Sequence, residues 1–168
     1  MSGIENGRMT HRHEGELVVF LIGMTINKPW RPDLWLPVFT AMPRMLRELS
    51  ADPGSGMLGY RLTLEGRNPT VIQYWRSHEE LYAYAADRAA RHRPAWAEFN
   101  RRAAKAPGAV GIWHETYLVD RAESVYVGTP ELGLARATER IPVPRGRNRA
   151  RERLAEGRTA LTPRRTGG

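Results

Sequence analysis

Hydrophobic and polar positions follow two different periods along residues 16–139. Residues 17–26 are apolar at both parities and rich in β-branched side chains, which is typical of a strand covered on both faces. From Leu34 to Leu49 the apolar positions recur at i, i+3, i+4 and i+7, which predicts a helix buried on one side. Residues 58–64 alternate, and after a turn residues 70–76 read as a second strand, so these two segments predict a hairpin.

A second helical segment and a last strand complete the pattern. Ser77 is the expected N-cap of a helix that extends to His92, because Glu80 follows three residues later in a capping box. Pro94 then introduces a short helix over residues 95–105. Residues 110–119 form a further apolar, β-rich run.

The element order β-α-β-β-α-β predicts an α+β fold of the ferredoxin-like, split βαβ type. This fold is a four-stranded antiparallel sheet with its helices on one face. The first and last strands are apolar on both faces, yet two helices cover only one face of a sheet. The other face is therefore expected to meet the same face of a second copy, which gives a homodimer, a dimeric α+β barrel.

Charge divides the 168 residues unevenly. The formal net charge is +8, but residues 140–168 hold nine Arg and two Glu, so the rest of the chain is nearly neutral. This segment has no aromatic residue and three prolines, which favours a disordered, Arg-rich tail. Residues 1–15 are polar and predict a mobile arm, leaving residues 16–139 as the domain. A chain ending at residue 140 is accordingly expected to keep its activity.

Several function classes are excluded or disfavoured at this point. The chain has no cysteine, which excludes disulfides, zinc fingers and thiol catalysis. A basic tail without aromatics is a poor nucleic-acid arm, so neither nucleic acid nor a membrane is an expected partner. The longest apolar run is too short to cross a bilayer and no signal peptide precedes it, which favours the cytoplasm.

Two apparent motifs predict no site. The G-x-G-x-x-G pattern of residues 54–59 follows a helix and precedes a strand, the reverse of a dinucleotide site. His11, His13 and Glu14 lie in a polar arm without fixed further ligands. No metal site is therefore expected, and His78, next to the N-cap, reads as an exposed residue.

The remaining histidines and aromatics suggest a pocket between sheet and helices. Small residues of the second helix leave room for a cavity with His92, Arg88, Tyr84 and Trp96 at its edge, although His92 also suits a plain helix end. His114 has the parity of the inward positions of the last strand, where a histidine is either functional or a satisfied core residue. Two imidazoles near one pocket would supply a proton acceptor and a donor near neutral pH. Flat apolar contacts for a substrate are expected from Trp75, Trp113 and Phe39.

The residues also carry a family resemblance. The most specific pieces are Trp75 with His78, the segment HRPAW at 92–96, the strand WHETY at 113–117, and the segment VYVGTP at 125–130. In these pieces the chain resembles a monooxygenase-like family of the dimeric α+β barrel superfamily, whose namesake is a fungal polyketide oxygenase. The similarity spans about residues 14–140.

The resemblance implies cofactor-free oxidation of an aromatic or polyketide-type substrate by molecular oxygen, in secondary metabolism. His92 or His114 would then be the base, Arg88 would stabilise the substrate anion, and Trp75 with Tyr84 would hold the ring. Relatives with this fold, including aldoxime dehydratases, imply an alternative in which haem binds through His92. A non-catalytic, small-molecule-binding barrel is the third reading. The segment 125–138 either closes the pocket or crosses to the other protomer.

Overall fold

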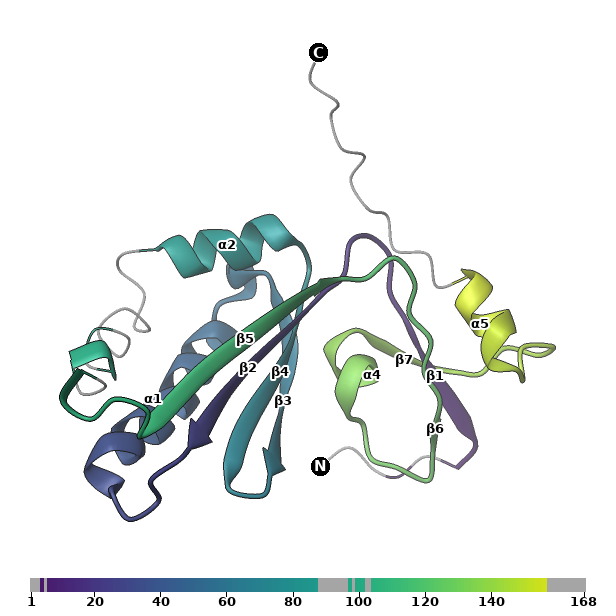
Figure 1. Cartoon of the computed structure of the whole chain (residues 1–168). Helices are drawn as coiled ribbons and strands as arrows, with labels where there is room; N and C mark the ends of the chain where they lie inside the picture. Colours follow the sequence, from purple (N-terminus) through teal and green to yellow (C-terminus); the bar gives the residue numbers. More distant parts are fainter. Residues whose placement is uncertain (1–3, 5, 88–96, 98, 102–103, 157–168) are drawn as a thin grey trace.

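The computed structural model describes residues 4, 6–87, 97, 99–101 and 104–156. Its main unit has the predicted order of elements, in which a strand and a helix precede a β-hairpin and a helix and a strand follow it (Figure 1). In chain order these elements are β2 (Val18–Ile26), α1 (Pro32–Ala51), β3 (Met57–Glu65), β4 (Asn68–Trp75), α2 (His78–Ala86) and β5 (Val110–Leu118). The predicted α+β class and the ferredoxin-like arrangement are both confirmed.

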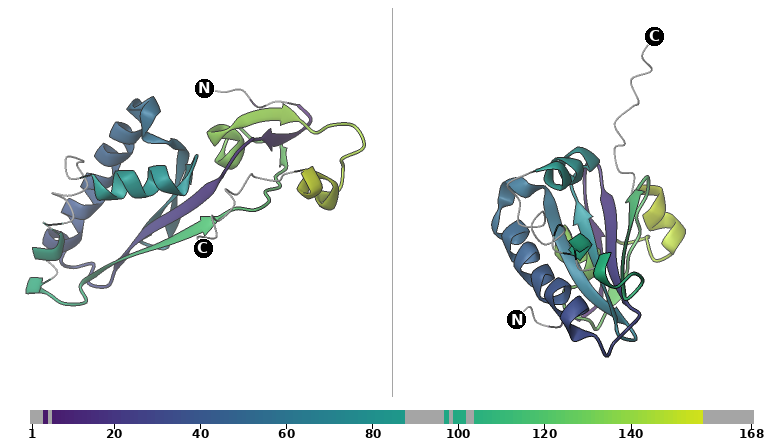
Figure 2. Two further views of the ribbon diagram at one scale, coloured as in Figure 1. Left: turned by 90° about the horizontal axis from the view of Figure 1, so that it is seen from above. Right: turned by 60° about the vertical axis from the view of Figure 1, so that its left-hand side comes forward.

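The main sheet is antiparallel throughout, with strand order β3-β4-β2-β5. The central strand β2 pairs with β4 and β5, so Val18 lies between Trp75 and Leu118. Helices α1 and α2 lie together on one side of this sheet (Figures 1 and 2). The face of the sheet that lies under these helices forms the core with them, and the outer face points away from both helices.

The core forms where α1 and α2 meet the start of β2. Val18, Leu49, Trp75 and Leu81 pack together, and Trp75 and Val18 are completely buried. The indole nitrogen of Trp75 donates a hydrogen bond to Gln73 Oε1 at 2.9 Å, so burial of this polar group costs little. The core therefore fixes the position of one end of α2 relative to the sheet.

Helix α2 begins as predicted and ends earlier than predicted. The Ser77 hydroxyl accepts a hydrogen bond from the Glu80 N–H at 3.1 Å, which confirms the N-cap. The helix ends at Ala86, and the segment from 88 to 96, including His92, lies outside the described residues. In the following segment residues 97, 99–101 and 104–105 are helical.

A second, three-stranded sheet corrects the prediction for both ends of the chain. It has the order β6-β1-β7, formed by β6 (Tyr126–Val127), β1 (Arg8–Arg12) and β7 (Glu139–Pro142), and it is accompanied by α4 (Gly133–Ala137) and α5 (Ala150–Glu156). The prediction of a mobile arm is thus wrong for residues 8–12, and that of a disordered tail is wrong for residues 140–156. Residues 157–168 lie outside the described part of the chain.

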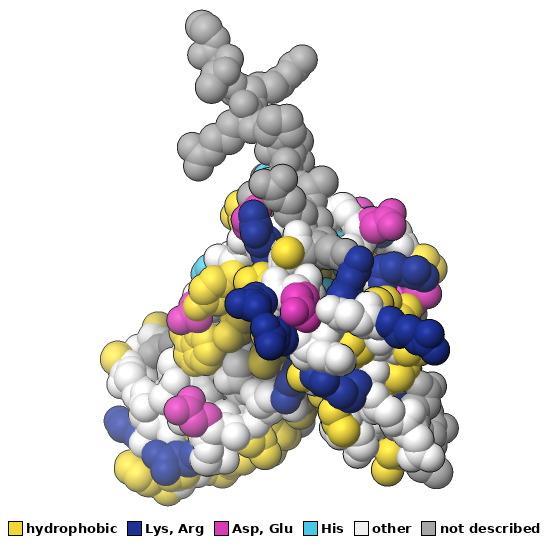
Figure 3. Space-filling view, turned by 90° about the vertical axis from the view of Figure 1, so that its right-hand side faces the viewer, with side chains coloured by type: hydrophobic (Ala, Val, Ile, Leu, Met, Phe, Trp, Pro, Cys, Tyr) yellow, Lys and Arg dark blue, Asp and Glu magenta, His cyan; other side chains and the backbone are white. Residues whose placement is uncertain are grey.

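Specific contacts explain why these polar ends fold. Met9 and Thr10 of β1 are buried, and the Thr10 hydroxyl donates to the Ser124 carbonyl at 2.7 Å. Arg153 of α5 is also buried, and its guanidinium bonds to Glu123 and to two backbone carbonyls. The two ends of the chain also stabilise each other through backbone hydrogen bonds, because β1 pairs with β7 across more than 120 residues of sequence. Lys and Arg side chains are prominent on this side of the molecule (Figure 3).

The outer face of the main sheet is partly covered by the chain itself. Helix α4 packs on β3, where a Cβ on Gly59 would lie 3.0 Å from Ala137. Gly133 of α4 lies close to the Tyr74 hydroxyl of β4. The predicted partner copy is therefore not needed to cover the β3–β4 half of this face. Within the described residues, no helix has the length and apolar character needed to cross a membrane.

Candidate functional site

A cavity of about 810 Å³ lies between the main sheet and the helices. All four strands of the main sheet contribute alternate residues to it, because every second side chain of a strand lies on the same face. These residues are Phe20, Ile22 and Met24 of β2, Tyr60 and Leu62 of β3, Val71, Gln73 and Trp75 of β4, and Ile112, His114 and Thr116 of β5. The helices contribute mainly apolar side chains, among them Val38, Phe39, Met42, Met45, Leu81 and Tyr84. Such a space, apolar with a few polar groups, suits an organic small molecule.

His114 is the described histidine that lines this cavity. It pairs in register with Ile22, and its imidazole lies 5.7 Å from the Phe20 ring. No hydrogen bond joins the imidazole to any residue in the described part of the chain. The side chain is exposed rather than buried, so the reading of His114 as a satisfied core residue does not describe it. A bound molecule could therefore engage either ring nitrogen.

The neighbouring Glu115 is not part of the same site. It lies on the opposite face of β5, where its carboxylate accepts a hydrogen bond from the Tyr117 hydroxyl at 2.6 Å. This hydrogen bond raises the pKa of Tyr117. Consecutive residues of a strand point to opposite faces, so Glu115 cannot orient the His114 imidazole.

Trp75 and Tyr84 are brought together at one end of the cavity. Their ring centroids are 5.8 Å apart with a tilt of 38°. Burial, with smaller contributions from Glu48 and Asp87, raises the pKa of Tyr84 to about 12. Tyr84 therefore stays a neutral phenol near pH 7 and can serve as a hydrogen-bond donor. Phe39 of α1 also lines the cavity, with its ring edge-on to Trp35 at 6.3 Å.

Trp113 lies outside the cavity. It lies on the outer face of the main sheet, over Gly23 of β2, and is not among the residues that line the cavity. It is one residue from His114 along the strand, and this odd step puts it on the other face. The structure therefore does not bring Trp113 together with Trp75. The other predicted site residues, Arg88, His92 and Trp96, lie outside the described residues.

Sequence reasoning missed several residues of the cavity. Gln73 is buried with its amide held by Trp75, and Thr116 faces the cavity two residues beyond His114. Both have the parity of a residue that was identified, so the period of the strands was a usable signal. Phe99, from the segment after the second helix, also lines the cavity. Its contribution depends on tertiary contacts that no local pattern reveals.

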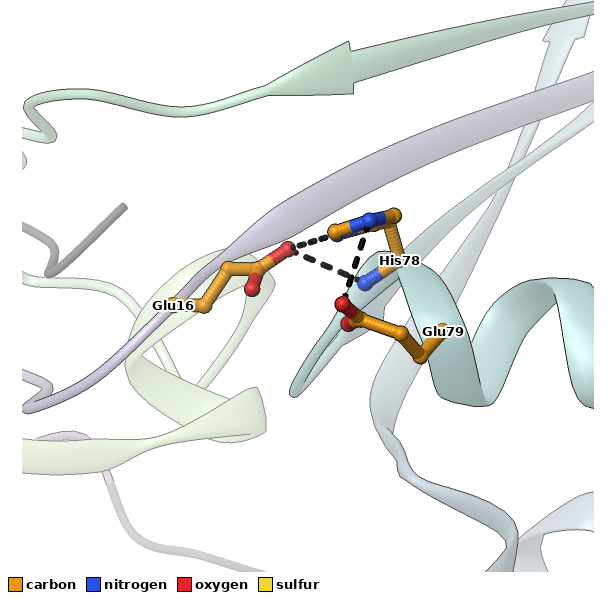
Figure 4. A group of neighbouring side chains, drawn as sticks. All are labelled: Glu16, His78 and Glu79. Atoms are coloured by element: carbon orange, nitrogen blue, oxygen red, sulfur yellow. Dashed lines mark hydrogen bonds and ion pairs between the residues drawn. The ribbon is translucent and has the colours of Figure 1, made fainter. Parts of the chain in front are cut away.

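A separate polar cluster joins the start of β2 to the start of α2 (Figure 4). Glu16 Oε1 accepts a hydrogen bond from the backbone N–H of His78 at 3.0 Å and lies 2.6 Å from His78 Nδ1. The other ring nitrogen, Nε2, lies 3.2 Å from Glu79 Oε1. The hydrogen bond to Glu16 raises the pKa of His78. His11, by contrast, bonds to the Ser124 hydroxyl at 2.7 Å and takes no part in this cluster.

Comparison with known families agrees with this architecture. Residues 17–134 match the family described as monooxygenase af470-like, which is most of the chain and all of the cavity-forming unit. The chain belongs to this family. The resemblance seen in the sequence is thereby confirmed. No significant match is found among curated proteins.

Solved structures with the same fold include two aldoxime dehydratases. One gives a TM-score of 0.60 at 16% identity, covering 83% of this chain and 43% of the dehydratase. The other, in complex with butyraldoxime, gives 0.56 at 16% identity over 67% of this chain and 34% of its own. This chain thus spans less than half of either enzyme. At such identities the likeness shows the fold alone.

A smaller protein is also similar to this monooxygenase-like chain. The cofactor-independent oxygenase SnoaB from Streptomyces nogalater matches with a TM-score of 0.39 at 14% identity, covering 61% of this chain and 92% of SnoaB.

Proposed function

We propose that this chain is a cofactor-free monooxygenase that oxidises a small aromatic or polyketide-type substrate in the cavity. The observation that carries the proposal is the position of His114, an imidazole on a largely apolar cavity wall with aromatic rings around it. Family membership supports the reaction class. The cavity volume of about 810 Å³ suits a drug-sized organic molecule.

The proposed chemistry needs only the substrate and molecular oxygen. His114 accepts a proton from an activated C–H or phenolic O–H group, which leaves an electron-rich anion. The anion passes its electrons to O₂, and conversion of an activated methylene to a carbonyl in this way releases water. The substrate supplies all the electrons, so no external reductant is consumed. Apolar walls exclude water and so protect the reactive intermediates.

The aromatic residues have distinct proposed roles. Trp75 provides a flat wall for the substrate ring, and Phe39 provides a second apolar contact from α1. Tyr84, neutral at pH 7, donates a hydrogen bond to the developing anion. Arg88 and His92 keep their proposed roles of anion stabilisation and second acid–base group, and Trp96 that of a substrate contact.

The setting of this reaction is also part of the proposal. We propose a homodimer that works in the cytoplasm on an intermediate of secondary metabolism. The apolar character of the cavity supports an aromatic substrate. Neither a nucleic acid nor a membrane is a partner in this proposal.

Oxygen uptake with a panel of phenolic and anthrone-type substrates tests the proposed reaction. His114→Ala is expected to lower the turnover rate by about 10²–10⁴-fold, the usual contribution of a general base. His13→Gln, whose imidazole bonds to the Glu16 carbonyl away from the cavity, is the matched control and should keep the wild-type rate. Activity that is unchanged in His114→Ala would remove this residue from the proton-transfer step.

A haem enzyme is the second candidate, favoured by the fold likeness to aldoxime dehydratase. The expected ligand, His92, is outside the described residues, so a spectrum is the direct measurement. Haemin added to the purified protein should leave the Soret band unshifted if the oxygenase proposal is correct. A shift that disappears in His92→Ala would favour the haem enzyme. If the protein neither consumes oxygen with any substrate of the panel nor shifts the Soret band, the results would favour a small-molecule-binding protein.

A further inference from the structure

The cluster of Glu16, His78 and Glu79 lies apart from the cavity and has no part in the proposed oxidation. Its members come from two segments 62 residues apart. One atom of each side chain lies within 4.8 Å of the others. The side chain of Glu16 is only 9% exposed, whereas those of His78 and Glu79 are 32% and 63% exposed. The cluster therefore has a buried anchor and an open, solvent-facing side.

Glu16 fixes the orientation of the His78 ring. The same carboxylate oxygen accepts the backbone N–H of His78 and faces Nδ1 at 2.6 Å. When the imidazole is neutral, a carboxylate at this distance keeps the proton on Nδ1, so Nε2 carries the lone pair that an incoming cation would bind in place of the second proton. Histidines that ligate metals usually donate their other ring N–H to a carboxylate in the same way. The ring is thus held as a metal ligand would be, with Nε2 directed toward Glu79.

The distance between Nε2 and Glu79 matches a shared ion. Two ligands about 2.0–2.1 Å from a tetrahedral zinc ion are about 3.3 Å apart, and His78 Nε2 lies 3.2 Å from Glu79 Oε1. With the imidazole neutral, Glu16 and Glu79 place two negative charges around it. Arg76, two residues before His78 in the chain, pairs with Glu80 instead. An added cation would therefore enter an electronegative position.

We propose that this cluster is a divalent cation site, of the Zn²⁺ class, with His78 Nε2 and the Glu79 carboxylate as ligands and Glu16 as the positioning carboxylate. Water completes the coordination on the exposed side. One imidazole and carboxylate oxygens suit Zn²⁺ better than Ca²⁺ or Mg²⁺, which prefer oxygen ligands alone. The bound ion would stabilise the start of α2, a helix that lines the cavity through Leu81 and Tyr84.

Calorimetric titration of the untagged, full-length chain with Zn²⁺ tests the site. One equivalent is expected to bind, and Glu79→Gln should weaken this binding at least tenfold, while His78→Ala should abolish it. Glu16→Gln should weaken it by about 10–100-fold, as expected for a carboxylate that orients a ligating histidine. Glu14→Gln, an exposed acid outside the cluster, is the control and should leave the affinity unchanged.

A second measurement guards against variants that misfold. Zn²⁺ should raise the melting temperature of the wild type and of Glu14→Gln, but not that of Glu79→Gln. The Glu79 side chain is 63% exposed and takes no part in the core, so this substitution is expected to leave the fold intact. Absence of binding up to about millimolar Zn²⁺, or binding unaffected by both Glu79→Gln and His78→Ala, would overturn the proposal. Both outcomes are independent of oxygen uptake, because the titration needs no substrate.

Discussion

At the scale of single residues, the contact between Gly23 and Trp113 shows how one side chain constrains its neighbour across a sheet. The two residues pair in register, and a Cβ added to Gly23 would overlap the Trp113 ring. Gly23→Ala must therefore displace the indole from β2. Overpacking of this kind costs roughly 1–3 kcal/mol, so chemical denaturation should show a free energy of unfolding lowered by about that amount.

Gly111 of β5 provides the matched control for this substitution. A Cβ at Gly111 would meet Thr25 at 3.6 Å, an ordinary van der Waals contact. Gly111→Ala should thus leave stability within about 0.5 kcal/mol of the wild type, or raise it slightly by restricting the unfolded chain. Equal destabilisation by the two alanines would show that the Trp113 ring is not the cause.

At the scale of elements, periodicity revealed the main sheet and its two helices but not the second sheet. Strand β2 is long and apolar, and α1 carries a buried stripe of Leu34, Leu46 and Leu49, so local pattern suffices for both. Strand β1 has the sequence RMTHR and is folded only through its pairing with β6 and β7. Four of its five residues are polar, and no periodic pattern in so short a segment predicts a partner more than 100 residues away. The cavity was predicted from the small residues of the second helix, of which Ala85 lines it, and from the inward parity of His114 on the last strand.

The folded C-terminal elements change the expected result of truncation. A chain ending at residue 140 loses half of β7, which pairs with β1 from Met9 to Arg12, and all of α5 with its buried Arg153. Its melting temperature should fall by roughly 5–10 °C, in line with a loss of a few kcal/mol. A chain ending at residue 156 keeps both elements and should melt close to the full-length protein. Thermal melts followed by circular dichroism decide between these outcomes, and equal melting temperatures would contradict the structural role of α5.

At the scale of the whole molecule, the coverage of the outer sheet face limits where a second copy can dock. Helix α4 packs on β3, whereas Tyr117 of β5 remains 51% exposed. The proposed homodimer should therefore use the β2–β5 half of this face. A Tyr117→Arg substitution places a charge in that interface, and burial of an unpaired charge is strongly unfavourable. Light scattering after size exclusion at micromolar concentration should show a dimer for the wild type and a monomer for Tyr117→Arg. Trp30→Arg, at a 71% exposed position before α1, should stay dimeric, and a monomeric wild type would refute the proposed assembly.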